Sequence, residues 1–97
     1  MPTYVSLINW TQQGIRDYKQ STDRAQAFRN AAESAGGHVR EILWTLGEYD
    51  IVSVVEFPDD ETAAAALLQV VAQGNIRSKT MRAFDTDQLQ AIISRTA

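Results

Sequence analysis

Hydrophobic and β-branched residues alternate with polar ones in four separate stretches of the chain, a pattern that is typical of β-strands. The predicted strands run from Thr3 to Trp10, from His38 to Thr45, from Ile51 to Phe57 and from Ile76 to Phe84. The second and third strands are separated by a short connection that contains Gly47, so we expect them to form an antiparallel hairpin.

Residues with helical spacing fill the stretches between these strands. The first predicted helix follows Ser21-Thr22-Asp23, which is expected to supply its N-cap, and it ends at Gly36-Gly37, where one glycine is expected to be left-handed. The second is capped by Asp59 and has its body from Ala63 to Gln73. Asp85 and Gln88 have the spacing of a capping box and predict a terminal helix. The polar segment 11–20 is predicted to be a loop with one helical turn.

The order of these elements is β-α-β-β-α-β followed by a helix. Two right-handed crossovers of this kind predict an α+β fold of the ferredoxin-like type, with a four-stranded antiparallel sheet and both long helices on one face. A chain of 97 residues accommodates one hydrophobic core, so residues 1–97 are expected to form a single domain.

The two faces of the predicted sheet differ in what they display. The face toward the helices is expected to include Val5, Leu7, Val52, Val54, Met81 and Ala83, and the open face Tyr4, Ser6, Ile8, Ile51, Ser53, Val55, Ser78 and Thr80. An open face with Ile8, Ile51 and Val55 is too apolar for water, and a second copy of the sheet is its simplest cover. The chain is therefore predicted to be a homo-oligomer.

Composition excludes several classes of protein. A net charge of −3 and a pI near 4.9 argue against binding to nucleic acid, which requires a concentrated positive surface. The chain has no cysteine, so it forms no disulfide or thiolate metal site. No apolar run approaches the roughly 20 residues that span a membrane, and no basic and apolar leader begins the sequence, so a cytoplasmic protein is expected.

Several short motifs together resemble the GYD-domain family, small bacterial domains related to the dimeric α+β barrels. The resemblance spans nearly the whole chain and rests on Leu7-Ile8-Asn9-Trp10-Thr11, Gly14-Ile15-Arg16, Gly36-Gly37, Gly47-Glu48-Tyr49-Asp50, Pro58-Asp59-Asp60, Gly74-Asn75-Ile76-Arg77 and Arg82-Ala83-Phe84. The tetrapeptide at 47–50 matches the pattern that names the family. The resemblance implies a fold and an oligomeric habit more than an activity.

The candidate ligand-binding residues are polar or aromatic and lie at predicted strand ends. Tyr49 and Asp50 offer a donor and an acceptor at the rim of the sheet, although Gly47 to Asp50 is also what a simple turn requires. Further candidates are an aromatic and amide wall with neighbouring cations, made of Asn9, Trp10, Thr11, Arg16 and Arg77. Capping of turns and solvation explain the same residues without a ligand.

His38, Tyr49 and Asp50 are the candidate catalytic residues, because each can move a proton. His38 is the only histidine and lacks a second coordinating residue of matching character, so neither haem nor a metal cofactor is expected. The hydroxyls of Ser6, Ser53, Ser78 and Thr80 fall on one face of the sheet, where they predict either a wet cavity or ordinary cross-strand pairing.

Three functions are consistent with this sequence. The first is a homo-oligomeric module that binds a small molecule between the open sheet face and the loop from Asn9 to Arg16. The second is a cofactor-independent monooxygenase or isomerase of the dimeric-barrel type. The third is a structural or regulatory subunit.

Overall fold

The computed structural model describes residues 1–96 of the chain. Its elements, in chain order, are β1 (Thr3–Trp10), α1 (Gln12–Arg16), a 3-10 turn η1 (Tyr18–Gln20), α2 (Ser21–Ser34), β2 (His38–Trp44), β3 (Ile51–Glu56), α3 (Asp60–Ala72), β4 (Ile76–Ala83) and α4 (Thr86–Ile93). The four strands agree with the predicted ranges to within one residue. The segment predicted as a loop is more helical than expected, since α1 and η1 occupy most of it.

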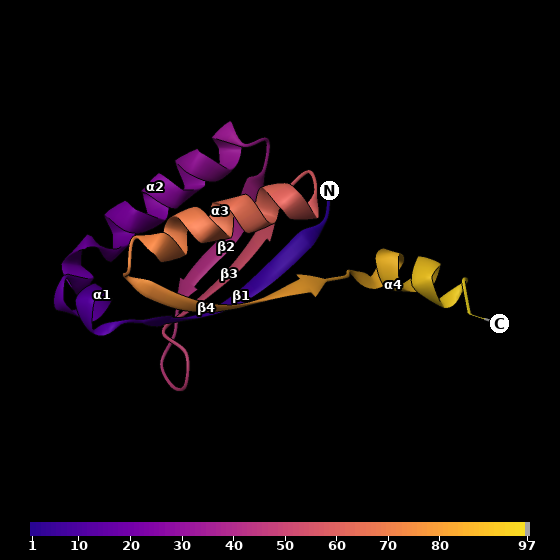
Figure 1. The fold of residues 1–97 in the computed structure, drawn as a ribbon. Helices are drawn as coiled ribbons and strands as arrows, with labels where there is room; N and C mark the ends of the chain where they lie inside the picture. Colours follow the sequence, from indigo (N-terminus) through magenta and orange to yellow (C-terminus); the bar gives the residue numbers. More distant parts are fainter. Residues whose placement is uncertain (97) are drawn as a thin grey trace.

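The strands form one antiparallel sheet in the order β2-β3-β1-β4. Both long helices, α2 and α3, lie over the same face of this sheet, and the other face is not covered by any described helix (Figure 1). This order and this layering confirm the predicted ferredoxin-like α+β fold.

The helix ends agree with the sequence prediction at three places and differ at one. Asp59 caps α3 by accepting a hydrogen bond from the Thr62 backbone N–H, and Asp85 and Gln88 form the capping box of α4. Gly36, with φ +81°, is the left-handed residue after α2. The predicted cap at Ser21-Thr22-Asp23 is wrong, because Ser21 is already the first residue of α2 and Gln20 precedes it without a side-chain cap.

The prediction of which sheet face meets the helices is wrong, and the two sets of residues are exchanged. Tyr4, Ser6, Ile8, Ser53 and Val55 are buried beneath the helices, with Val55 only 3% exposed. A shift of one residue exchanges every side chain between the two faces of a strand. Both faces of β1 and β3 carry aliphatic residues, and the serines on the buried face make that face resemble the solvated one.

The hydrophobic core lies between the sheet and the two long helices. Its buried members are Tyr4, Ala32, Val39, Val55, Phe57 and Ala63. The helices contribute mainly alanine to it, and no large side chain among the described residues is completely buried. Small side chains on the helices leave space above the sheet.

The open face of the sheet is aliphatic along its centre. It carries Val5, Leu7, Leu43, Val52, Val54 and Met81, which the strand pairing places side by side. Leu43 and Met81 are 53% and 47% exposed. The residues on this face are therefore more apolar than the set that was predicted for it. A surface of this kind is expected to be covered by another protein surface.

The terminal helix α4 extends away from the sheet and from the other helices (Figure 1). Its apolar residues Leu89, Ile92 and Ile93 are exposed to solvent. No described helix is both long enough and apolar enough to cross a membrane.

Candidate ligand cavity

A cavity of about 430 Å³ lies between the sheet and the two helices that cover it. Its floor is made by side chains of all four strands, and its roof is made by α2 and α3. The roof consists largely of alanine, including Ala25, Ala31, Ala35, Ala63 and Ala66. Small-molecule sites in proteins typically have volumes of roughly 300–1,000 Å³ and mostly apolar walls, so this cavity has the size and character of a binding site.

The floor of the cavity carries a row of hydroxyl groups. The Thr80 hydroxyl is hydrogen-bonded to that of Ser6 across the β1–β4 pair and to that of Ser78 on its own strand, each at 2.8 Å. Ser53 lies directly across from Ser6 in the β1–β3 pair and also lines the cavity. The hydroxyls of Ser6 and Thr80 therefore pair across strands, as one of the two predictions has it, and all four hydroxyl residues line the cavity; that this cavity is wet stays a prediction.

One end of the cavity is aromatic. Trp10 at the end of β1 and Trp44 at the end of β2 both line it, and they are the two tryptophans of the chain. Arg24 of α2 lies on the wall and donates hydrogen bonds to the backbone oxygens of Gly14 and Asp17. The guanidinium thus joins α2 to the preceding turn, and this contact fixes the position of the wall.

The segment from Thr11 to Arg16 is anchored to the turn between α3 and β4. The Thr11 hydroxyl donates to the Gly74 oxygen at 2.6 Å and accepts from the Gly14 N–H, so it also caps α1. Gly14 packs so tightly that an added Cβ would lie 1.9 Å from the Asn75 oxygen. These contacts give Thr11 a structural role, and Arg16 is exposed nearby.

Asp50 connects the β2–β3 hairpin to the end of β1. Its carboxylate accepts hydrogen bonds from the Trp10 backbone N–H at 3.0 Å and from the Asn9 side-chain amide at 3.4 Å. The Asn9 amide also donates to the Glu48 backbone oxygen at 2.9 Å. The structure therefore brings Asn9, Trp10 and Asp50 together at one end of the sheet.

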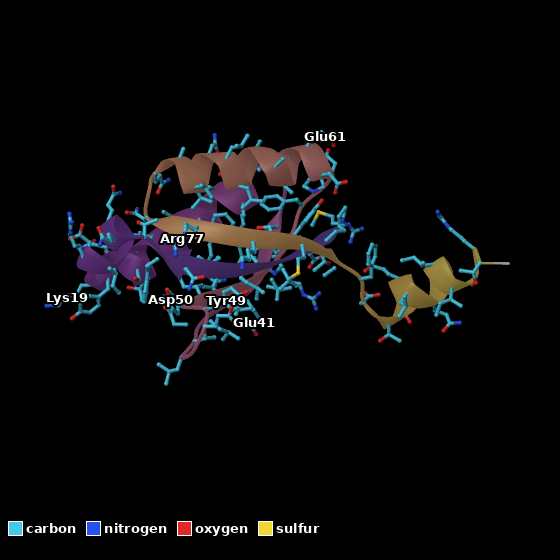
Figure 2. All side chains as sticks on the ribbon, turned by 60° about the horizontal axis from the view of Figure 1, so that its bottom comes forward. Lys19, Glu41, Tyr49, Asp50, Glu61 and Arg77 are labelled. Carbon is cyan, nitrogen blue, oxygen red and sulfur yellow. The ribbon has the colours of Figure 1, made fainter. Side chains whose placement is uncertain are left out.

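Tyr49 and Arg77 lie apart from the cavity. Figure 2 shows Tyr49 and Asp50 beneath the sheet, on the side opposite α3. The Lys79 ammonium lies 5.6 Å from the centre of the Tyr49 ring. Arg77 is opposite Asn9 in the β1–β4 pair. Ligand binding by these residues and by Asn9, Thr11, Arg16 and Asp50 stays a prediction.

His38 lies far from the other two candidate catalytic residues. It begins β2, whereas Tyr49 and Asp50 follow the other end of that strand, and seven strand residues span roughly 20 Å. His38 is exposed and borders a small recess beside α2. Within residues 1–96, no three histidine, aspartate or glutamate side chains are grouped as a metal site requires.

Tyr4, on the floor of the cavity, has a pKa that is clearly raised from its ordinary value. Burial, a hydrogen bond to the Asp60 carboxylate and the charge of that carboxylate together raise the pKa of Tyr4 to about 12. The phenol is therefore neutral at physiological pH and donates its proton to Asp60 at the start of α3.

Of the seven predicted ligand-binding residues, Trp10 is the one that lines the cavity. Arg24 and the alanine roof line the cavity but were not among the residues predicted for the site. A helix rich in alanine, with Ala25 and Ala35 facing a row of serines, is a signal that could have indicated a cavity, because small groups on both layers fill little of the space between them.

The fold and the cavity define a ferredoxin-like α+β domain with a pocket between its sheet and helices α2 and α3 that is large enough for a small molecule. The GYD domain matches residues 4–93, and the chain belongs to this family. This family assignment agrees with the resemblance carried by Gly47-Glu48-Tyr49-Asp50 and the neighbouring motifs.

A named protein and a solved crystal structure, both from Thermus thermophilus, are similar to this chain. The named protein, glutamine synthetase and cystathionine beta-lyase binding protein, is 31% identical over 93 residues, which cover 94% of this chain and 97% of that protein. The crystal structure matches with a TM-score of 0.56 and 25% identity, over 89% of this chain and 96% of that chain.

Proposed function

We propose that this protein is a homo-oligomeric domain that binds a small molecule in the cavity between its sheet and helices α2 and α3. The observation that supports the proposal most strongly is the cavity itself, which combines apolar walls with a hydroxyl row on its floor. A pocket of this size with mostly apolar walls is typical of small-molecule sites, and the hydroxyl row supplies polar groups that can orient a ligand.

This site differs from the one the sequence analysis favoured. That hypothesis placed the ligand between the open face and the Asn9–Arg16 loop, because it assigned the serines to the open face. The serines are on the helix-covered face, and the segment after Asn9 is packed against Gly74 and Asn75. The ligand is therefore proposed to bind on the helix-covered face of the sheet, where the hydroxyls lie.

The open face supports the oligomeric part of the proposal. Its aliphatic centre is bordered by Glu41 on β2 and by Arg77 and Lys79 on β4, which the pairing places on the same face. When two such sheets face each other across a two-fold axis parallel to the strands, β2 of each lies over β4 of the other. Arg40 on β2 is paired with Glu56, so Glu41 is the acidic group of this edge that can meet the basic edge of the second copy, which is then complementary in charge at that place as well as in hydrophobicity.

A matched pair of variants tests the cavity. Ala66 lines it and is partly buried, whereas its neighbour Ala64 on the same helix is exposed and lies outside it. A thermal-shift screen of small phenols, alcohols and carboxylates is expected to give ligands for the parent and for Ala64→Phe, and none for Ala66→Phe. Ligands that stabilise all three proteins equally would place the site elsewhere.

A second candidate is a regulatory subunit that binds other proteins. The name of the Thermus relative, which refers to binding of two enzymes, supports it. The exposed apolar residues of α4 are a surface on which such a contact could form. Size-exclusion chromatography with purified glutamine synthetase and cystathionine beta-lyase tests it, and co-elution that requires α4 is the expected result.

A further inference from the structure

The cavity contains almost no charge. Among the residues that line it, Arg24 is the single one with a charged side chain at neutral pH. Its two terminal nitrogens donate to the backbone oxygens of Gly14 and Asp17 at 3.1 and 3.2 Å. The floor beneath α2 and α3 has hydroxyl groups but neither a carboxylate nor an ammonium group.

The hydroxyl row provides both donors and acceptors. Ser6, Thr80 and Ser78 have three hydroxyl protons and share two hydrogen bonds, so one proton of the row remains for another partner. Ser53 lies outside these two hydrogen bonds and adds a further hydroxyl next to Ser6. A neutral group that both donates and accepts matches this row.

A charged group at the floor would lose its hydration there; a cation would find no counter-charge in the lining, and for an anion the one counter-charge, Arg24, lies on the wall and is hydrogen-bonded to the Gly14 and Asp17 oxygens. Burial of an unpaired charge costs far more than burial of a hydroxyl that finds a hydrogen bond. We infer that the cavity selects an uncharged, largely apolar molecule whose hydroxyl or carbonyl group is bound by Ser53 and the Ser6–Thr80–Ser78 row. This inference rests on the proposed function, since it names the ligand class of the same site.

Three probes of the same length test the selection. 1-Octanol, octanoate and octylammonium each have eight carbons in an unbranched chain and differ at pH 7 in the charge of one end. Binding is followed by tryptophan fluorescence, because both tryptophans line the cavity and report its occupation. We expect 1-octanol to bind at least tenfold more tightly than either ion.

Two variants separate the hydroxyl from the cation. Ser53→Ala is expected to weaken 1-octanol binding by roughly threefold to tenfold, the effect of losing one hydrogen bond. Arg24→Gln removes the cation together with the contacts that fix this wall, so it is judged by the ratio of the 1-octanol and octanoate affinities, which is expected to stay at least tenfold. Octanoate that binds as tightly as 1-octanol, and loses its affinity in Arg24→Gln, would overturn the inference of an uncharged ligand while the cavity would still be a binding site.

If the cavity binds no small molecule, so that the proposed function is wrong, the three probes give a different result. In that case none of the three probes changes the tryptophan fluorescence, and the parent behaves in the screen as Ala66→Phe does. Binding of 1-octanol with equal affinity to the parent and to Ser53→Ala would overturn the assigned role of that hydroxyl.

Discussion

The carboxylate of Asp50 accepts a hydrogen bond from the backbone N–H of Trp10 at 3.0 Å and thereby holds the β2–β3 hairpin against the end of β1. Two further backbone contacts strengthen this junction, because Asp50 N–H donates to the Ile8 oxygen and its own oxygen accepts from the Thr45 N–H. The side chain that the sequence motif emphasises thus positions one of the two tryptophans at the cavity.

This relationship predicts that Asp50→Ala destabilises the fold. The Trp10 N–H would lose its acceptor, and an unsatisfied part-buried donor costs about 1–3 kcal/mol. Urea denaturation followed by circular dichroism measures the change in the free energy of unfolding. Asp50→Asn keeps one acceptor oxygen and should lose less, and exposed Glu48→Ala serves as the control. An Asp50→Ala variant as stable as the parent would contradict a structural role.

The same substitution is expected to have different effects at two neighbouring residues of β3. Val54 is on the open face and Val55 is in the core, so Val54→Asp should dissociate the proposed oligomer and leave a folded monomer. Val55→Asp should unfold the domain, because it buries an unpaired charge. Light scattering measures the mass and circular dichroism measures the fold. An unchanged mass for Val54→Asp would show that the open face is not the interface.

The charged edges of the open face predict a charge reversal that can be rescued. If Lys79 faces Glu41 of the partner subunit, Lys79→Glu should weaken association, and the double variant Lys79→Glu with Glu41→Lys should restore it. Sedimentation at low and high salt gives the dissociation constants, and the penalty of the single variant should shrink as salt screens the charges. A double variant that associates no better than Lys79→Glu would exclude this orientation of the two sheets.

The raised pKa of Tyr4 predicts a loss of stability at alkaline pH. The folded protein holds the phenol proton up to about pH 12, whereas the unfolded chain releases it near 10.0. Between these values the folded state binds more protons than the unfolded state, so the free energy of unfolding falls as pH rises. Urea titrations from pH 9 to pH 11.5 should show a shallower fall for Tyr4→Phe than for the parent. Equal slopes would show that other groups cause the loss.

Local signals in the sequence predicted the elements of the fold well. Asp59, Asp85 and Gly36 each act through a cap or a left-handed turn that depends on a few adjacent residues, and the structure has them where expected. The N-cap predicted at Ser21 is wrong. Serine, threonine and aspartate in sequence favour an N-cap, but η1 leads directly into α2.

The side of the sheet that meets the helices could not be predicted in the same way. Val54 and Val55 have the same chemistry, and nothing within β3 distinguishes the buried one. The choice depends on how two alanine-rich helices pack over serines in different strands, which is a property of the assembled layers. For the same reason, the cavity and the place of Arg24 on its wall could be seen only in the structure and could not be predicted from the sequence.

The isolation of α4 has a consequence for amide hydrogen exchange. An eight-residue helix that extends away from the rest of the described chain has little stability in water, even with the capping box of Asp85 and Gln88. Its amides should therefore exchange almost as fast as those of an unfolded peptide. Amides in the centre of β1 should exchange only when the whole domain unfolds. Any slowing of exchange in residues 86–93 would measure how much of the time a partner holds this helix.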